Sequence, residues 1–294
     1  MSMKSLFNTV KQKDGLVKQL DQFLLKHDTH VEDGDRKSVT NSPSSALGCS
    51  RANYYQREGI QKDVIEPRVR RIFDNGHGVH ARLQGYLTAM GFLLMDEVPL
   101  FNAEYEIQGH TDGIGTLSKN PKVCEILEIK SINTNQFSKL REPKEEHRAQ
   151  AQVYIFTAEE HRKMLKIKYP TRKDFVRSRF KRWKRYEKLY QHLTDGSNFT
   201  RAEKIKYKVN QHMKMDKILY DLIKPITKAI VLYEDKNTQE LKEFLIEMDE
   251  GLMHEVLEKY QINNEYWKMQ QVPPRECKAK TEGRWCPYVH HCFE

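Results

Sequence analysis

The spacing of apolar residues changes along this chain of 294 residues, and these changes limit the folds that it can adopt. Between Pro67 and Gly91, apolar side chains recur at helical intervals, which predicts one long amphipathic helix. Short apolar or alternating segments follow, and they predict strands near residues 93–100, 104–110, 112–117 and 122–132. Helical spacing returns after Pro143 and continues to about Glu160. This alternation of two periods predicts an α/β fold class.

Other elements are predicted on both sides of this region. An amphipathic helix is expected over residues 5–27, a polar loop over 30–40, and a helix that opens at Ser42-Pro43 and carries Cys49. A further helix is expected at about 200–224. A last strand at 228–233 precedes a long helix whose apolar residues begin at Leu241 and reach Tyr260.

The composition excludes several classes of protein. With 38% hydrophobic and 31% charged residues, the chain is neither collagen-like nor wholly disordered. It contains no apolar run of the roughly 18 residues that a membrane helix needs, and its first residues do not resemble a secretory signal. We therefore expect a cytoplasmic protein without a membrane partner. In that compartment, its five cysteines are interpreted as metal ligands in preference to disulfides.

Positive charge is concentrated in one segment. Residues 161–188 hold 13 of the 50 Lys and Arg residues and 2 of the 41 Asp and Glu residues, so the rest of the chain carries no positive excess. So dense a run of cations is typical of a surface that binds a phosphate backbone. The residues expected to contact nucleic acid are Arg177, Lys181, Arg182, Lys184 and Arg185. The interleaved apolar residues Val176, Phe180, Trp183 and Tyr190 are expected to face the core rather than to stack on bases.

Three segments carry residues suited to catalysis. His80 lies one turn after Gly76 on the predicted long helix. Asp112 is expected where a strand ends in a turn made flexible by glycine, so that its carboxylate projects into a cleft. Glu128 and Lys130 are two residues apart on a predicted strand and therefore share one face of it.

Together these side chains offer ligands for a divalent cation. One imidazole, from His80, and two carboxylates, from Asp112 and Glu128, suit Mg²⁺ or Mn²⁺. Such an ion can lower the pKa of a water and neutralise charge that develops on a phosphate, and Lys130 would help to hold either group. From the residues alone, a surface salt bridge between Glu128 and Lys130 is the alternative.

Four motifs occur in an order that is similar to a known family. They are Gly76-x-x-x-His80, Gly109-His110-Thr111-Asp112-Gly113, Glu128-Ile129-Lys130 and Gln150-x-x-x-Tyr154. They resemble the motifs of the RecB-like branch of the PD-(D/E)XK nucleases, over about residues 42–158 and 228–292. Thr111 stands where the family name has proline. The resemblance implies a restriction-endonuclease-like core, with a mixed central sheet flanked by helices, a helical insertion and a C-terminal cysteine cluster.

The resemblance also assigns roles to individual residues. It implies that the metal ligands are His80, Asp112, Glu128 and the carbonyl of Ile129. It implies that Lys130 is the catalytic lysine, and that Gln150 and Tyr154 position the DNA and the active site.

The cysteines suggest a second metal centre. Cys277, Cys286 and Cys292 lie near the end of the chain and Cys49 lies far upstream, which gives the four thiols that tetrahedral zinc or a four-iron cluster requires. This arrangement resembles the 4Fe-4S site of AddB-type and CRISPR-associated RecB-like exonucleases. Zinc is the alternative, with His290 and His291 as further ligands. The expected role is a structural cross-link, whereas Cys124 is expected to be buried in the core.

The expected function follows from the resemblance. It is a divalent-metal-dependent deoxyribonuclease, an exonuclease that processes DNA ends with single strands favoured, in recombination, repair or phage DNA metabolism. A helicase or recombination protein could be its partner. The alternatives are a CRISPR-adaptation nuclease that trims spacers and a catalytically inactive DNA-binding protein. The expected parts are an N-terminal helix and loop (1–41), the first part of the core (42–158), a basic insertion (159–227) and the remainder (228–294).

Overall fold

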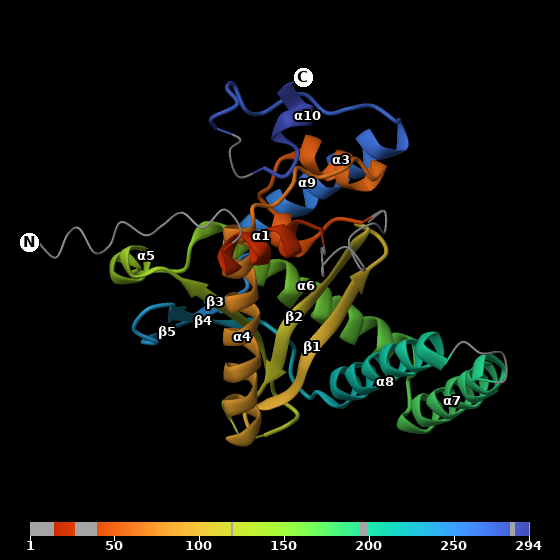
Figure 1. Ribbon diagram of the computed structural model, residues 1–294. Coiled ribbons are helices and arrows are strands. Elements are labelled where there is room, and N and C mark those ends of the chain that lie inside the picture. The colour runs from red at the N-terminus through yellow and green to blue at the C-terminus, as the bar shows by residue number, and fades with distance from the viewer. Residues whose placement is uncertain (1–14, 27–39, 119, 195–198, 283–285, 294) are drawn as a thin grey trace, which may run out of the picture.

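The computed structural model of the protein describes residues 15–26, 40–118, 120–194, 199–282 and 286–293. In these ranges the chain forms an α/β fold, in which a five-stranded mixed sheet is flanked by helices (Figure 1). The strands are β1 (Leu93–Asn102), β2 (Ile107–Gly115), β3 (Glu125–Ile132), β4 (Lys228–Asp235) and β5 (Leu241–Glu247). The helices are α1 (Leu16–Lys26), η2 (Pro43–Ser45), α3 (Ser50–Glu58), α4 (Pro67–Ala89), α5 (Thr134–Lys139), α6 (Glu145–Lys168), α7 (Arg172–Thr194), α8 (Phe199–Asp221), α9 (Glu250–Lys268) and α10 (Val289–Phe293).

The strands lie in the same order in the sheet as in the sequence, from β1 to β5. Three of the neighbouring pairs are antiparallel, whereas β3 and β4 are parallel. A parallel pair needs a long crossover connection. Here the crossover runs from Ile132 to Lys228 and contains α5, α6, α7 and α8.

Helix α4 covers one face of the sheet. Its buried residues Val79 and Leu83 pack in one apolar cluster with Leu127 and Ile129 of β3. The helix begins with Pro67 in its first turn and is followed by Gly91, whose φ of 76° lies in the left-handed region. Both ends of this helix are therefore as the sequence predicts.

Helix α6 covers the opposite face. Ala151, Tyr154 and Ile155 of α6 pack in the main apolar cluster with Ile126 of β3 and Val231 of β4. The helix continues to Lys168, past the end predicted near Glu160. The sheet is therefore enclosed on both faces, and a polar group that faces α6 from β3 lies in the interior.

The sequence predicts a turn around Asp112, and this prediction is wrong. Residues 107–115, from both predicted segments, form one strand, β2, with Asp112 inside it. A Cβ atom on Gly113 would lie 2.3 Å from Leu93 Cδ2, and one on Gly115 would lie 2.3 Å from Phe92 Cε1. The glycines are therefore required by close packing within the sheet and not by a turn.

The helix predicted from Leu241 is also wrong in its first part. Residues 241–247 form β5, which pairs with β4. Helix α9 begins after Asp249, whose side chain accepts a hydrogen bond from the Leu252 N–H and caps the helix. The apolar spacing between Leu241 and Met248 fits a helix, but the unpaired edge of β4 provides hydrogen-bond partners that favour a strand.

The N-terminal predictions are met in part. The described portion of the helix predicted over 5–27 is α1, while residues 1–14 and most of the loop predicted over 30–40 lie outside the described residues. Cys49 is the N-cap of α3 rather than a residue within a helix. None of the helices in the described ranges has an apolar stretch sufficient to span a bilayer.

Helices α7 and α8 form a hairpin at the side of the sheet (Figure 1). Helix α8 packs on α6 and β1, and α7 packs on α8. The basic segment of the sequence therefore lies mainly in the outer helix of this hairpin.

We expect Gly115→Ala to lower the free energy of unfolding by about 1–3 kcal/mol, because the new Cβ would force the buried Phe92 ring to move. The matched control is Gly85→Ala on α4, where a Cβ meets no atom within 4 Å. There we expect a gain of about 0.5–1 kcal/mol from helix propensity. Urea denaturation of the two variants measures both effects, and equal changes would contradict the packing argument.

Candidate functional site

The candidate site lies where β2 and β3 separate. Their backbone pairing covers Gly113, Ile114 and Gly115 of β2 and ends there. Beyond this point the Thr111 hydroxyl donates to the Leu127 carbonyl at 2.7 Å, and Asp112 Oδ2 accepts the Ile129 N–H at 2.5 Å. Side chains of β2 therefore replace the backbone bonds that a continuous ladder would make, and the Asp112 carboxylate is held in the gap.

His80 reaches this gap from α4. Its Nδ1 lies 3.0 Å from Asp112 Oδ1, so the second carboxylate oxygen is engaged as well. Burial lowers the pKa of His80, but its hydrogen bond and charge interaction with Asp112 more than compensate, and the net pKa is raised. The helix, β2 and the backbone of β3 thus meet at one carboxylate.

Glu128 is the most strongly perturbed acid of the site. It is buried, its Oε1 lies 2.6 Å from Lys130 Nζ, and its Oε2 has no hydrogen-bond partner among the described residues. Burial, followed by the negative charge of Asp112, raises the pKa of Glu128 to about 8, although Lys130 and His80 oppose this shift. Two carboxylates close together in the interior need more positive charge than Lys130 supplies.

Helix α6 adds a chain of hydrogen bonds. Lys130 Nζ donates to Gln150 Oε1 at 2.9 Å, and Gln150 Nε2 donates to the Tyr154 hydroxyl at 3.2 Å. That hydroxyl donates in turn to the His110 carbonyl at 2.7 Å. Gln150 and Tyr154 are one turn apart, so they face the sheet together, and burial raises the pKa of Tyr154.

The sequence-predicted residues of the acidic site therefore lie together. Two groups of contacts meet across α4, β2, β3 and α6. One joins His80 to Asp112, and the other joins Glu128, Lys130, Gln150 and Tyr154. The backbone links them, through the Ile129 N–H on Asp112 and the His110 carbonyl on Tyr154. Ile129 was predicted to contribute its carbonyl; the contact that it makes in this site is the hydrogen bond from its N–H to Asp112. As the side chains stand, no group of three or more His, Cys, Asp or Glu residues in the described ranges is arranged to hold a metal ion.

Two more polar side chains lie beside this set, and sequence reasoning missed the first of them, Gln84. Gln84 lies one turn after His80 and donates through Nε2 to the Asp112 carbonyl at 2.9 Å, a position that helical spacing from His80 could have found. His147 Nδ1 lies 2.8 Å from the Tyr233 hydroxyl on β4. Burial and the nearby Lys130 charge lower the pKa of His147 to about 3, so it is neutral at ordinary pH.

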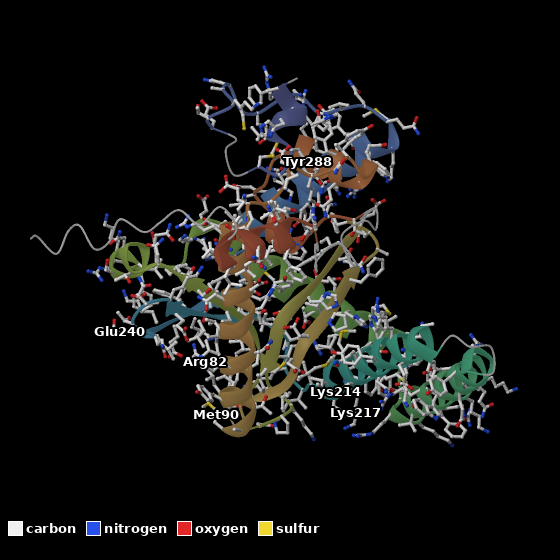
Figure 2. The ribbon with its side chains drawn as sticks, viewed as in Figure 1. Arg82, Met90, Lys214, Lys217, Glu240 and Tyr288 are labelled. Carbon is white, nitrogen blue, oxygen red and sulfur yellow. The ribbon has the colours of Figure 1, made fainter. Side chains whose placement is uncertain are left out.

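The four cysteines predicted as ligands line one cavity of about 50 Å³ between α3, α10 and the segment before α10. They are Cys49, Cys277, Cys286 and Cys292. Burial raises the pKa of Cys49 and of Cys286, and the neighbouring thiols raise that of Cys286 further. Figure 2 labels Tyr288 in this region, where it packs on Tyr55.

The other sulfur and imidazole groups lie elsewhere. Cys124 is buried in the main apolar cluster, as predicted. His290 Nδ1 lies 3.0 Å from Asp63 Oδ2, and the His291 ring contacts Tyr55 edge-on. Neither histidine lines the cysteine cavity.

The basic residues of α7 divide between its two sides. Arg182 Nη1 donates to the buried Asp216 Oδ2 of α8 at 2.6 Å, so its charge is balanced within the hairpin. All five predicted contact residues are exposed, and the other four are Arg177, Lys181, Lys184 and Arg185. Val176 and Phe180 are exposed as well, so the prediction that they face the core is wrong.

Comparisons with known proteins add little to this geometry. A comparison with family models gives no match, and neither does one with curated proteins. Among solved structures, one described as "Crystal structure of SSO0001" aligns with 95% of this chain and 96% of its own, at 16% sequence identity and a TM-score of 0.46.

The pKa of Glu128 predicts a pH dependence of stability in the absence of metal. Between its ordinary value of 4.5 and about 8, the unfolded chain has released this proton while the folded protein keeps it. The folded state is therefore destabilised as pH rises through this range. We expect Glu128→Gln to lose this dependence and to exceed the wild type in free energy of unfolding by a few kcal/mol at pH 8.

Urea denaturation from pH 5 to pH 8 in the presence of a chelator measures this difference. Glu125→Gln is the matched control, because Glu125 lies on the same strand and accepts the exposed Leu117 N–H. Its profile should run parallel to that of the wild type. A parallel profile for Glu128→Gln would contradict the raised pKa.

Proposed function

We propose that the protein is a divalent-metal-dependent deoxyribonuclease with a restriction-endonuclease-like core, of the RecB-like branch of the PD-(D/E)XK nucleases. The observation that carries this proposal is the pair of buried carboxylates, Asp112 and Glu128, held beside Lys130 where β2 and β3 separate. This acid, acid and lysine set in the split of a sheet matches the motifs named from the sequence. It also faces helix α6, which supplies the following Gln150 and Tyr154.

The donor chemistry of the site fits a divalent cation. Glu128 Oε2 is buried without a hydrogen-bond partner among the described residues, and the pKa of Glu128 is raised by burial and by the negative charge of Asp112. An ion would relieve both costs. His80, Asp112 and Glu128 would hold it together with the Ile129 carbonyl, and oxygen-rich ligands with one imidazole suit Mg²⁺ or Mn²⁺.

When bound, the cation would supply a Lewis acid for hydrolysis of a phosphodiester bond. The protein side chains position the rest of the chemistry. Lys130 brings positive charge beside Glu128, where it can hold a phosphate oxygen or the attacking water. Gln150 holds the Lys130 ammonium, and Tyr154 holds Gln150 against the His110 carbonyl, so the ammonium has a fixed direction.

We propose DNA ends as the substrate, with single strands favoured, in recombination, repair or phage DNA metabolism. The exposed cations of α7 support a nucleic-acid substrate, because they give the hairpin a strong attraction for phosphates. The intact set of Asp112, Glu128 and Lys130 favours an enzyme over an inactive DNA-binding protein.

We further propose that Cys49, Cys277, Cys286 and Cys292 hold a 4Fe-4S cluster. Their convergence on one cavity supports the proposal, since a set of four thiols suits such a cluster. Cys49 precedes α3, whereas the other three residues lie near the C-terminus, so a cluster would cross-link α3 to the C-terminal segment and stabilise that contact.

We expect Asp112→Asn, Glu128→Gln and Lys130→Ala to reduce cleavage at least about 100-fold, because each removes charge from the site of phosphoryl transfer. The assay uses end-labelled single- and double-stranded DNA, linear and circular, with Mn²⁺. Glu125→Gln should cleave as the wild type does. Mn²⁺ should also raise the melting temperature of the wild type more than that of Glu128→Gln, and full activity of Asp112→Asn would refute the assignment.

For the cysteine site, we expect anaerobically purified protein to be brown and to contain about four irons per chain, as a 4Fe-4S cluster requires. Cys286→Ser should lose the iron and lower the melting temperature, whereas Cys124→Ala should keep the iron because Cys124 lies in the main core. Iron and zinc analysis decides the outcome. A colourless protein with one zinc per chain would contradict the 4Fe-4S cluster and identify the site as a zinc site.

A further inference from the structure

Helix α7 has two faces of different character. Phe175 and Tyr186 are buried on the side that meets α8. On the same side, Arg182 is paired with Asp216, and Arg179 donates to the Met213 carbonyl of α8. At 100° per residue, these four positions lie within one half of the helix. The opposite half therefore faces away from α8.

The outward half carries a stripe of cations, which we name the outer stripe. Lys173, Arg177, Lys184 and Lys188 succeed one another at intervals of four, seven and four residues, so they lie along one line of the helix. All four are exposed, and none of them forms an ion pair within the described part of the chain. Asp174 and Glu187 are the acidic residues of α7, and neither lies on this line. The stripe thus presents unneutralised positive charge to solvent.

Phe180 lies in the middle of the outer stripe. It is 58% exposed, and the Lys184 ammonium lies 4.8 Å from the centre of its ring. Arg177 precedes it by three residues and Lys184 follows it by four, so cations flank the ring along the helix. An aromatic ring that is left in water between cations, on a helix that buries Phe175 nearby, is not required for packing.

We infer that the outer stripe is a binding surface for single-stranded DNA, on which an unpaired base stacks against Phe180 while the flanking cations hold phosphates. The choice of DNA rests on the proposed function. The stacked base is inferred from the exposed Phe180 ring. Every base has an aromatic face, and stacking on exposed aromatic side chains is the usual means of holding single strands. The charge of the stripe is complementary to a phosphate backbone.

A membrane surface is a poorer fit to the same residues. An amphipathic helix that binds lipid needs a wide apolar face, with several large side chains that enter the acyl region. The exposed apolar side chains on this half of α7 are Phe180 and Val176, and the four cations of the outer stripe lie beside them. Helix α8 adds the exposed Lys214 and Lys217 to the hairpin (Figure 2), which strengthens the positive potential without enlarging the apolar area.

The test is DNA binding by the full chain with Glu128→Gln and a chelator, so that no cleavage occurs. The probes are a fluorescein-labelled oligo(dA) strand containing 2-aminopurine, the matching duplex, and vesicles of phosphatidylglycerol and phosphatidylcholine. Phe180→Leu removes the ring and keeps an apolar side chain, and Phe180→Trp restores an aromatic face. Val176→Ala is the matched control, because Val176 is equally exposed on the same side.

We expect Phe180→Leu to weaken binding of the single strand about tenfold and to abolish quenching of 2-aminopurine, whereas duplex binding changes less than about twofold. Phe180→Trp and Val176→Ala should remain within about twofold of the parent. Lys184→Gln should lower the slope of binding against salt by about 0.7 for the single strand.

Equal weakening of single strand and duplex by Phe180→Leu, or no weakening, would overturn the stacking role. Vesicle binding that depends on Phe180 would replace DNA by a lipid surface. These results are independent of catalysis. If the wild type fails to cleave DNA, the proposed nuclease is refuted while the binding measurement still decides the role of the stripe.

Discussion

The candidate site depends on how the sheet opens between β2 and β3. Where their backbone pairing ends, the Ile129 N–H would be left without a partner on the β2 side. A buried, unpaired N–H costs about 1–3 kcal/mol. The Asp112 carboxylate accepts this bond, and the Thr111 hydroxyl satisfies the Leu127 carbonyl in the same way. Side chains at 111 and 112 therefore take over the backbone bonds that are lost at the gap, and this fixes the direction of the Asp112 carboxylate.

An open sheet brings charge into the interior, where charge is disfavoured. Lys130 neutralises one oxygen of Glu128, and His80 engages one oxygen of Asp112. The second oxygen of Glu128 remains without a hydrogen bond among the described residues, and burial together with the charge of Asp112 raises the pKa of this acid. Removing the Lys130 ammonium would leave two acids buried together. The same groups thus lower the stability of the metal-free fold, and under the proposed function they are the groups that would bind a cation.

The parts of the structure that follow from local geometry could be predicted from the sequence. Strand parity places Glu128 beside Lys130, and helical spacing places Gln150 beside Tyr154. The errors arise where distant residues decide. Gly113 suggests a turn until the Leu93 side chain is seen against it, and Arg182 differs from its neighbours because it pairs with Asp216 on another helix. The strand β5 likewise depends on the free edge of β4, which a short sequence window does not contain.

The parallel pairing of β3 and β4 explains why a basic hairpin can be attached to this site. A parallel pair obliges the chain to leave the sheet and return. Helix α6 makes the outward passage across the sheet and delivers Gln150 and Tyr154, and α8 makes part of the return while packing on α6 and β1. Helix α7 is thereby separated from the sheet and has one side to bury against α8. Its other side is free of packing requirements, so cations and an exposed Phe180 can occupy it without a cost to the core.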